Sequence, residues 1–335
     1  MKRAGNLFDK VISIDNLRLA DDKARRGKKN IKEIKEHDLH REEDLQALHD
    51  MLAAGQYHTS KYHTFLVHEP KERVISKLPY YPDRIVHHAI LNILEPIWVG
   101  KMTADTYACI KHRGIHKCAE NIRHILHIDH AGTRYCLKID IRKYYPSIDH
   151  DIMMRMVERT IKDERLIGLI DEIVRSAEGL PIGNYLSQYL ANIYLLTFDH
   201  WVKEVLHVRY YFRYVDDMVF LANTKEELRH ILESVRTYLC GLRLQVKDNW
   251  QVFPVDARGI DYLGYVFFHD YTLLRKGMKK RIFKLCYKYK AGRMSIKRLM
   301  TSMASYKGWL DYCDSNNLRQ KINRYTNESL LSIRA

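Results

Sequence analysis

Two adjacent carboxylates, Asp216 and Asp217, constrain the fold more than any other feature, because apolar runs flank them on both sides. The flanking residues, 210–212 and 218–221, are of types that favour β-strands. This pattern predicts a β-hairpin with the acids at its turn. Neighbouring carboxylates repel each other and resist burial, so they need a compensating charge. Magnesium or manganese would supply that charge through hard oxygen ligands, whereas an ordinary polar turn would need no metal.

A third carboxylate, Asp140, lies near the end of another predicted strand. Apolar and polar residues alternate over residues 135–141, as in a half-buried strand. The chain then turns at Pro146, and Asp149 is placed to cap a helix that runs from Ile152. A strand end beside a turn is a common position for a metal ligand, although such an aspartate alone is more often structural.

A glycine-containing loop, residues 179–184, precedes a predicted helix over residues 186–206. Gly179 and Gly183 would let the backbone approach a ligand closely, and the helix N-terminus could meet a phosphate. A plain helix entry would explain the same residues. The order of elements predicts a βαββαβ arrangement that brings the three carboxylates onto one antiparallel sheet. Three carboxylates can hold two divalent metal ions about 3.5–4 Å apart, an arrangement that drives in-line phosphoryl displacement.

The net charge of +15 is concentrated towards the C-terminus. Residues 275–335 contain sixteen Lys or Arg and three acidic residues, a net charge of +13. Tyrosines and a tryptophan are interleaved with these basic residues, as in surfaces that bind a nucleic-acid backbone. A solvated basic helical surface is the alternative.

Nothing in the sequence suggests a membrane or secreted protein. It has no apolar run of about eighteen residues, and residues 1–6 lack the apolar core of a signal peptide. The six cysteines form no close pair, as is typical of reduced thiols. We therefore expect a cytoplasmic protein with no membrane partner.

The remaining elements follow from hydrophobic periodicity and turn residues. We predict helices over most of residues 1–56, after Pro82, over 115–127, over 225–239 behind a Thr224 cap, and from 279 onward. We predict strands at 62–68 and 73–78, which form a hairpin, and at 242–247, 262–267 and 273–275.

Together these motifs resemble the reverse transcriptases over residues 57–320. Tyr214-Val215-Asp216-Asp217 is similar to the signature tetrad of that family, and Asp140 to its first catalytic aspartate. The loop form resembles the reverse transcriptases of diversity-generating retroelements, as do three shorter stretches. The loop reads Ile182-Gly183-Asn184-Tyr185-Leu186-Ser187-Gln188, and the three other stretches are residues 65–71, 106–109 and 250–252.

The resemblance implies an α+β fold of the right-hand polymerase type, with fingers, a palm of antiparallel sheet backed by helices, and a helical thumb. The expected parts are an N-terminal helical extension at 1–56, fingers at 57–134, a palm at 135–270 with finger–palm insertions at 150–180, and a basic thumb at 271–335.

The resemblance also implies an RNA-directed DNA polymerase in a bacterial or phage-infected cell. Such enzymes copy a template-repeat RNA into cDNA with errors at template adenines, for mutagenic retrohoming. The implied cofactor is two Mg²⁺ ions, with Mn²⁺ as a substitute. The implied partners are a structured template RNA, the primer and cDNA, dNTPs, and an oligomer of a small basic accessory protein.

Residue roles follow from the same resemblance. Asp140, Asp216 and Asp217 are the expected catalytic metal ligands, and the carbonyl of Ile141 would complete one metal shell. The expected dNTP-binding residues are Lys71, Arg73, Tyr145, Ile182, Gly183 and Lys247, with Tyr145 as the steric gate against a ribose 2′-hydroxyl and Lys247 as a general acid for pyrophosphate. The expected primer and template residues are Tyr214, Ser187, Gln188, Tyr262, Leu263, Gly264, Lys279, Lys280 and Arg281.

Two of these positions carry alternatives. Tyr145 could instead pack in the core, as aromatic residues at turns often do. Ile182 stands where most reverse transcriptases have Gln, and it cannot hydrogen-bond an incoming nucleotide. Losing one or two such contacts would reduce base discrimination about tenfold.

Three other functions share some of these motifs. An antiphage or otherwise domesticated reverse transcriptase would use the same chemistry. A non-catalytic RNA-binding scaffold would leave the adjacent carboxylates unused, which is electrostatically unfavourable. An RNA-directed RNA polymerase shares the carboxylates, but the ring of Tyr145 argues against it.

Overall fold

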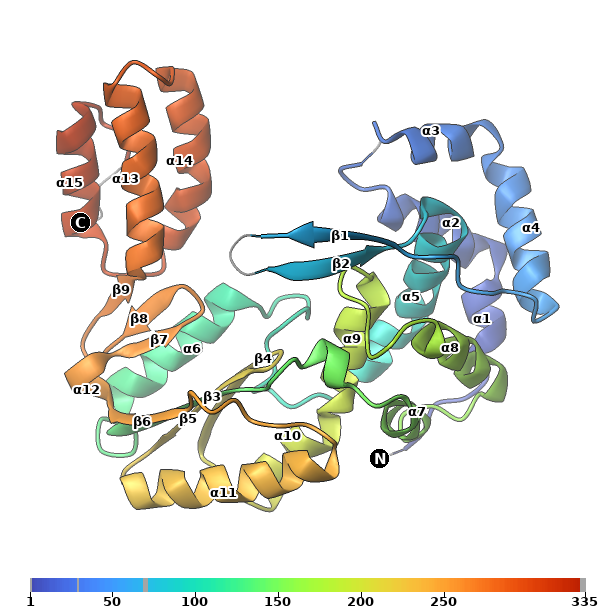
Figure 1. The fold of residues 1–335 in the computed structure, drawn as a ribbon, viewed down its shortest axis with the longest axis horizontal. Helices are drawn as coiled ribbons and strands as arrows, with labels where there is room; N and C mark the ends of the chain where they lie inside the picture. Colours follow the sequence, from blue (N-terminus) through green and yellow to red (C-terminus); the bar gives the residue numbers. More distant parts are fainter. Residues whose placement is uncertain (1, 29, 69–71, 332–335) are drawn as a thin grey trace. The chain divides into compact units, whose positions relative to one another are not determined.

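The chain divides into two compact units, each assembled from segments that are distant in sequence (Figure 1). The computed structural model describes residues 2–28, 30–68 and 72–331. Unit 1 comprises Met1–Cys109, Asp140–His207 and Ser234–Asp248, and unit 2 comprises Ile110–Ile139, Val208–Glu233 and Asn249–Ala335. Both contain helices and strands, as the predicted α+β class requires.

The N-terminal part of unit 1 is helical, as predicted for residues 1–56. It contains α1 (Phe8–Ile12), α2 (Ile14–Ala24), α3 (Lys32–Leu39) and α4 (Arg41–Ala53). A fully buried carboxylate, Asp21, joins these helices through ion pairs to Arg25 and Arg41 and a hydrogen bond from the Tyr80 hydroxyl. Burial opposes the ionisation of Asp21, but the neighbouring His37 ring and hydrogen bonds from Arg25 and Tyr80 hold its pKa well below its usual range.

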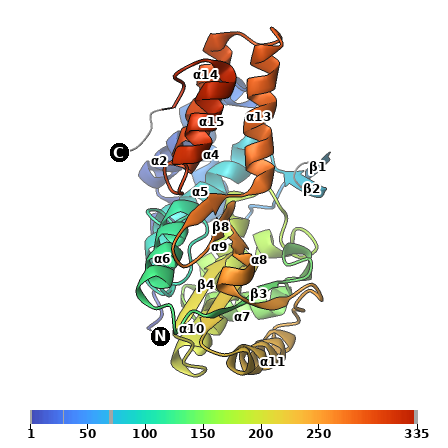
Figure 2. The ribbon, with the colours of Figure 1, turned by 90° about the vertical axis from the view of Figure 1, so that its left-hand side faces the viewer.

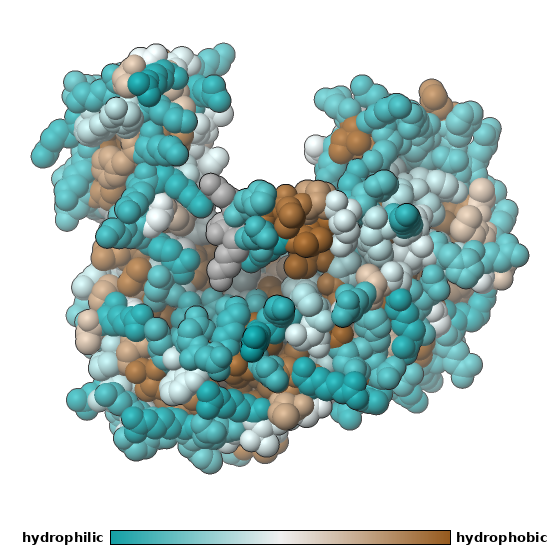
Figure 3. All heavy atoms as spheres, viewed as in Figure 1, coloured by the Kyte–Doolittle hydropathy of each residue, from teal (hydrophilic) through white to brown (hydrophobic). Residues whose placement is uncertain are grey.

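The predicted hairpin in unit 1 is confirmed. Strands β1 (His63–Val67) and β2 (Arg73–Lys77) pair antiparallel, with Val67 opposite Arg73. Lys71 lies outside the described residues. Phe65, Leu66 and Val74 are each more than half exposed, and Figure 3 shows apolar side chains at the surface over this hairpin. The chain continues through η1 (Tyr80–Arg84) into α5 (Ile85–Val99), against which α2 packs.

The rest of unit 1 includes five short helices: η2 (Tyr145–Ser147), α7 (His150–Glu158), α8 (Glu164–Arg175), α9 (Tyr185–Tyr194) and α10 (Leu196–Glu204). The Asp149 cap is confirmed, because its Oδ1 accepts a hydrogen bond of 2.9 Å from the Ile152 amide. The predicted single helix over 186–206 is wrong. It breaks at Leu195, where φ is −97° and ψ is 8°. Tyr194, Leu195 and Leu196 are all buried, so the break lets both helices pack inward without a glycine or proline signal.

Unit 2 contains a four-stranded sheet with the strand order β4-β5-β3-β6. The strands are β3 (Tyr135–Asp140, whose last residue belongs to unit 1), β4 (Tyr210–Tyr214), β5 (Asp217–Ala222) and β6 (Gln251–Pro254). Strands β4 and β5 form the predicted hairpin, with Tyr214 paired to Asp217, and α6 (Ile115–Ile128) packs on β4. Helix α11 (Lys225–Gly241), whose residues from Ser234 onward belong to unit 1, starts behind Thr224, whose Oγ1 accepts from the Glu227 amide at 3.2 Å, as predicted.

A second, three-stranded antiparallel sheet follows α12 (Val255–Arg258) in unit 2. Its strands are β7 (Ile260–Tyr262), β8 (Tyr265–Phe267) and β9 (Thr272–Leu274). The predicted single strand over 262–267 is wrong, because Leu263 and Gly264 have φ of 50° and 88° and form a tight hairpin turn. The predicted strand over 242–247 in unit 1 is reduced to one bridge between Ile141 and Val246, since Arg243 adopts a positive φ of 56°.

The C-terminal part of unit 2 is a helical bundle, as predicted for the basic segment. Helix α13 (Lys276–Lys290) packs against both α14 (Ile296–Leu310) and α15 (Asn316–Thr326) (Figures 1 and 2). The interior of this bundle contains Ile282, Cys286, Leu299, Met303 and Ile322. No helix in the described part of the chain is long and apolar enough to span a lipid bilayer.

Candidate active site

The turn that carries Asp216 is short, and side chains of unit 2 hydrogen-bond to its backbone. Only Val215 and Asp216 lie between β4 and β5, and Val215 has a φ of 60°. That conformation is unusual for a β-branched residue, and such strain is of the order of 1–3 kcal/mol. The buried guanidinium of Arg213 donates to the Val215 carbonyl at 3.0 Å, and the Tyr262 hydroxyl donates to the Asp217 carbonyl at 2.9 Å. The surrounding side chains therefore fix the strained turn.

Asp217 also has a cationic neighbour in its own sheet. Its Oδ2 lies 3.5 Å from the Nζ of Lys138 on β3. Sequence reasoning assigned Lys138 no role, yet a signal was present: residues 138 and 140 alternate with apolar neighbours and so share one face of a strand. Burial raises the pKa of Tyr262 well above its usual range, so its hydroxyl remains a donor at neutral pH.

Asp140 is the last residue of β3, as predicted, and Lys247 holds it. The Lys247 Nζ donates to the Asp140 Oδ2 at 2.6 Å, and the Lys247 amide donates to the Asp140 carbonyl at 2.8 Å. The other carboxylate oxygen of Asp140, Oδ1, is buried and accepts no hydrogen bond from any described residue. Buried polar atoms are rarely left in this condition, and a hard divalent cation would satisfy the oxygen. The adjacent Ile141 is fully buried.

No three His, Cys, Asp or Glu side chains converge on a self-contained metal site anywhere in the described ranges. This does not conflict with magnesium, which is usually held by one or two carboxylates together with water and substrate phosphates. The donor set of hard carboxylate oxygens, with one of them buried and unsatisfied on Asp140, fits such an ion.

Two glycines in unit 1 bring the predicted nucleotide loop close to other backbone. The Ile182 carbonyl accepts from the Ser76 amide on β2 at 2.8 Å. At Gly183, whose φ is 121°, an added Cβ would lie 3.0 Å from the Ser76 carbonyl oxygen. At Gly179, whose φ is 60°, it would lie 2.5 Å from the Tyr145 carbonyl oxygen. The loop is therefore fitted between β2 and the turn that carries Tyr145.

The two neighbouring tyrosines in that turn have different environments. Tyr144 is buried, and its hydroxyl donates to the Ala191 carbonyl. Tyr145 is half-buried and lies edge-on to Tyr144, with ring centroids 5.8 Å apart. Of the two rings, only that of Tyr144 is fully packed in the core. Two other residues of unit 1 were predicted to bind the nucleotide. Ile182 is half-buried, and Arg73 is exposed.

The residues predicted to contact primer and template are divided between the two units. Within unit 2, the Leu263–Gly264 turn adjoins the start of α13, because the Arg275 amide donates to the Gly264 carbonyl at 2.9 Å. An added Cβ at Gly264 would lie 2.7 Å from the Trp309 ring. The basic residues Lys279, Lys280 and Arg281 follow on α13. In unit 1, by contrast, Ser187 is buried and Gln188 is exposed.

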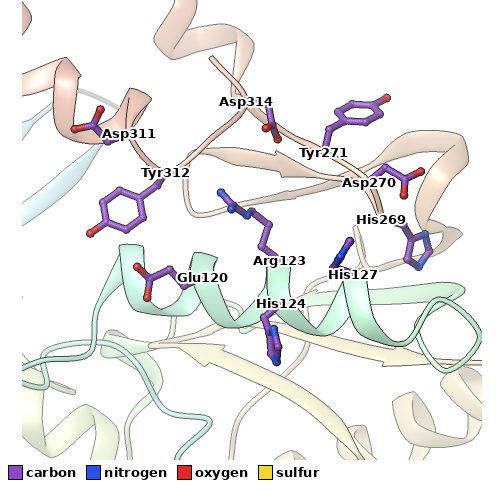
Figure 4. A pocket seen from close by; sticks show the side chains of 10 residues that line it. All are labelled: Glu120, Arg123, His124, His127, His269, Asp270, Tyr271, Asp311, Tyr312 and Asp314. Carbon is purple, nitrogen blue, oxygen red and sulfur yellow. The ribbon is translucent and has the colours of Figure 1, made fainter. Parts of the chain in front are cut away.

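A separate open cavity of about 830 Å³ lies in unit 2 and contains none of the predicted site residues (Figure 4). Its walls come from α6, the β8–β9 turn and the segment after α14. Two of its carboxylates already have partners: Asp311 pairs with Arg319 at 2.6 Å, and Asp314 accepts from the Thr272 amide at 2.7 Å. Both carboxylates are therefore engaged by other groups of unit 2.

Comparison with known proteins gives a consistent result. Residues 67–267 match the family model described as reverse transcriptase (RNA-dependent DNA polymerase). The chain is 25% identical over 254 residues to protein YkfC of Escherichia coli, covering 71% of this chain and 60% of that protein. It is 23% identical over 177 residues to the group II intron-encoded protein LtrA of Lactococcus lactis, covering 49% and 29%. The chain thus spans less than two thirds of either relative.

Among solved structures, the fold is similar to apo telomerase from Candida tropicalis. The TM-score is 0.54 at 10% identity, covering 74% of this chain and 52% of the telomerase chain. At that identity the likeness concerns the fold alone. It confirms the fold class expected from the sequence, the α+β right-hand polymerase fold.

Proposed function

Since the chain belongs to the reverse transcriptase family, we propose that it is an RNA-directed DNA polymerase that extends a primer with dNTPs along an RNA template. The observation that carries the proposal is the environment of Asp140. This aspartate ends a strand and has one buried carboxylate oxygen without a donor among the described residues. A strained, braced turn presents the adjacent Asp216 and Asp217, and such strain is typical of functional sites.

Asp140, Asp216 and Asp217, with the carbonyl of Ile141, would hold two Mg²⁺ ions, for which Mn²⁺ could substitute. When bound, these ions would lower the pKa of the primer 3′-hydroxyl and neutralise charge on the triphosphate. The chain itself supplies the orientation of the carboxylates, through the hydrogen bonds to the Asp216 turn and through the strand that ends at Asp140.

Unit 1 would bind the incoming dNTP. Lys71 and Arg73 would contact the triphosphate, and the half-buried ring of Tyr145 would exclude a ribose 2′-hydroxyl. Ile182 and Gly183 would line the site from a loop whose position is set by the Ser76 hydrogen bond. Lys247 would donate a proton to the departing pyrophosphate, as its position beside Asp140 allows.

Unit 2 would contact the primer and template. Tyr214 and the turn formed by Leu263 and Gly264, backed by Tyr262, would position the primer end, and Ser187 and Gln188 of unit 1 would contact the template. Lys279, Lys280 and Arg281 on α13 would bind the nucleic-acid backbone, which predicts strong salt dependence. In this proposal residues 57–134 act as fingers, 135–270 as palm and 271–335 as thumb, behind the extension at 1–56.

More specifically, we propose mutagenic copying of a structured template-repeat RNA for a diversity-generating retroelement, with a small basic accessory protein as partner. The support is at position 182. An isoleucine side chain cannot hydrogen-bond the nascent base pair, and the Ile182 carbonyl already accepts from Ser76. The loop therefore constrains the nascent pair mainly by shape.

The test is primer extension on a primed RNA with Mg²⁺ and either dNTPs or rNTPs, by the purified chain with its cognate RNA and accessory protein. The proposal expects extension with dNTPs only and its loss in Asp216→Asn/Asp217→Asn, with RNA binding retained. Extension with rNTPs alone would instead indicate an RNA polymerase. RNA binding without any Mg²⁺-dependent incorporation would indicate a scaffold.

A further inference from the structure

Lys138 contacts three residues of unit 2, and one of them is Asp217. Its Nζ donates to the Asp261 carbonyl at 2.7 Å, lies 3.5 Å from the Asp217 Oδ2, and sits 5.5 Å from the centroid of the Tyr262 ring. The first distance is that of a hydrogen bond, whereas the second is that of an ion pair without one. The hydrogen bond to Asp261 therefore fixes the lysine against β7, and its positive charge attracts the Asp217 carboxylate.

Tyr262 contacts both Lys138 and the backbone of Asp217. It is fully buried, and its hydroxyl donates to the Asp217 carbonyl at 2.9 Å. Asp217 is thus contacted at its carboxylate by Lys138 and at its carbonyl by Tyr262, and these two residues contact each other. The Asp261 carboxylate does not compete for the lysine, because it pairs with Arg275.

We propose that Lys138 and Tyr262 are positioning residues that fix Asp217 at a set spacing from the Leu263–Gly264 turn. The inference rests on the proposed function, in which Asp217 is a metal ligand and the turn holds the primer end. Tyr262, the last residue of β7, and Lys138 of β3 would together make a rigid connection between Asp217 and this turn. Nucleotidyl transfer needs such a connection, because misplacing the reacting atoms by about 1 Å can slow a reaction about a hundredfold.

The charge of Lys138 allows an experiment to distinguish its positioning of Asp217 from simple packing. A fixed ammonium group beside Asp217 repels a cation that binds there, and both side chains are only 26% and 32% exposed, so solvent screens the repulsion incompletely. Removing the charge should strengthen metal binding while loosening Asp217. A residue with a purely structural role would not change these two quantities in opposite directions.

Four variants test the inference: Lys138→Met, which removes the charge and the anchor; Lys138→Arg, which retains both; Tyr262→Phe, which removes only the hydroxyl; and Lys117→Met as a control. Lys117 is an exposed lysine of α6 that pairs with Glu120. Mn²⁺ binding to the substrate-free protein is measured by electron paramagnetic resonance, kcat and KM by primer extension at saturating metal, and folding by thermal denaturation.

For Lys138→Met we expect Mn²⁺ to bind about threefold to tenfold more tightly while kcat falls about tenfold, with KM for dNTP little changed. Lys138→Arg should stay within about twofold of the wild type in metal binding and should largely restore kcat. Tyr262→Phe should lower kcat about fivefold and leave Mn²⁺ affinity unchanged, because it removes one hydrogen bond and no charge.

The inference is overturned if Lys138→Met behaves like Lys117→Met in both measurements, or if its Mn²⁺ affinity weakens. If Lys138→Met does not fold, an unchanged kcat in Tyr262→Phe overturns it, and a reduced kcat at unchanged Mn²⁺ affinity supports it. If the wild type never polymerises, the proposed function fails separately. Mn²⁺ binding then decides: tighter binding to Lys138→Met supports the contact with Asp217, and equal binding overturns it.

Discussion

The two units each pair one strand-end aspartate with one lysine, but they anchor the lysines differently. In unit 1, the Lys247 Nζ donates directly to Asp140 at 2.6 Å, and no other hydrogen bond or ion pair holds that amine among the described residues. In unit 2, Lys138 is hydrogen-bonded to the Asp261 carbonyl and lies 3.5 Å from Asp217. A cation that displaced each lysine from its aspartate would therefore release Lys247 but leave Lys138 in place.

This difference suggests a division of labour between the units. A lysine that is released beside the reacting groups can move a proton, whereas a lysine that stays anchored can only position its neighbour. In unit 1, which contains Asp140, the residues Tyr145, Ile182 and Gly183 would select the nucleotide. The unit 2 residues near Asp217, namely Tyr262, Leu263 and Gly264, would hold the primer. The predictions below test this comparison.

The largest expected effect is on Asp140 itself. Asp140→Asn keeps the size of the side chain but removes the charge that a metal ion needs, so kcat for dNTP incorporation should fall at least about a thousandfold. Steady-state primer extension measures this. Asp248→Asn is the matched control, because Asp248 is an exposed carboxylate next to Lys247. Similar activity in both variants would remove Asp140 from the site.

Next is the contrast between the two lysines. Arginine retains the charge of lysine but does not release its proton, so Lys247→Arg should lower kcat about a hundredfold. The equivalent change in unit 2, Lys138→Arg, should have little effect on kcat. Pre-steady-state rates for both variants measure the contrast. Equal rates in the two variants would abolish the distinction between a proton donor and a positioning residue.

A smaller effect is expected at the half-buried ring of Tyr145. Tyr145→Ala should reduce discrimination against rNTPs about thirtyfold, because the ring that would clash with the 2′-hydroxyl is gone. The ratio of kcat/KM for dATP and ATP measures this. The control is Tyr144→Phe, which removes the hydrogen bond to Ala191 from a buried ring and should lower stability without changing sugar selection. Unchanged discrimination in Tyr145→Ala would assign the gate to another residue.

The smallest expected effect concerns fidelity. Ile182→Gln would add a side chain that can hydrogen-bond the nascent pair, so misincorporation opposite template adenine should fall about tenfold. Sequencing of products on a matched RNA template measures it, with Ile182→Leu as the apolar control. An error spectrum identical to that of the wild type would show that fidelity is determined elsewhere.

Local sequence signals were sufficient for the elements that carry the site. The apolar runs on both sides of Asp216 predicted the β4–β5 hairpin, and the alternation over 135–141 placed Asp140 at a strand end. Asp149 and Thr224 marked helix starts correctly, because a side-chain cap is a contact over three residues.

Features that depend on distant residues were not predictable in this way. The break at Leu195 has no local signal and follows from how α9 and α10 pack. The turn at Leu263–Gly264 was hidden within a run of strand-forming residues. The contacts of Lys138 with Asp217 and Tyr262 join residues up to 124 positions apart, and only the tertiary structure brings them together.

The most direct test of the account is to sequence the DNA that the purified chain makes on its native RNA with Mg²⁺, dNTPs and its accessory protein. The wild type should produce cDNA complementary to the template, with errors concentrated opposite adenines, and Asp216→Asn/Asp217→Asn should produce none. The absence of cDNA from the wild type, or equal cDNA from both proteins, would contradict the account.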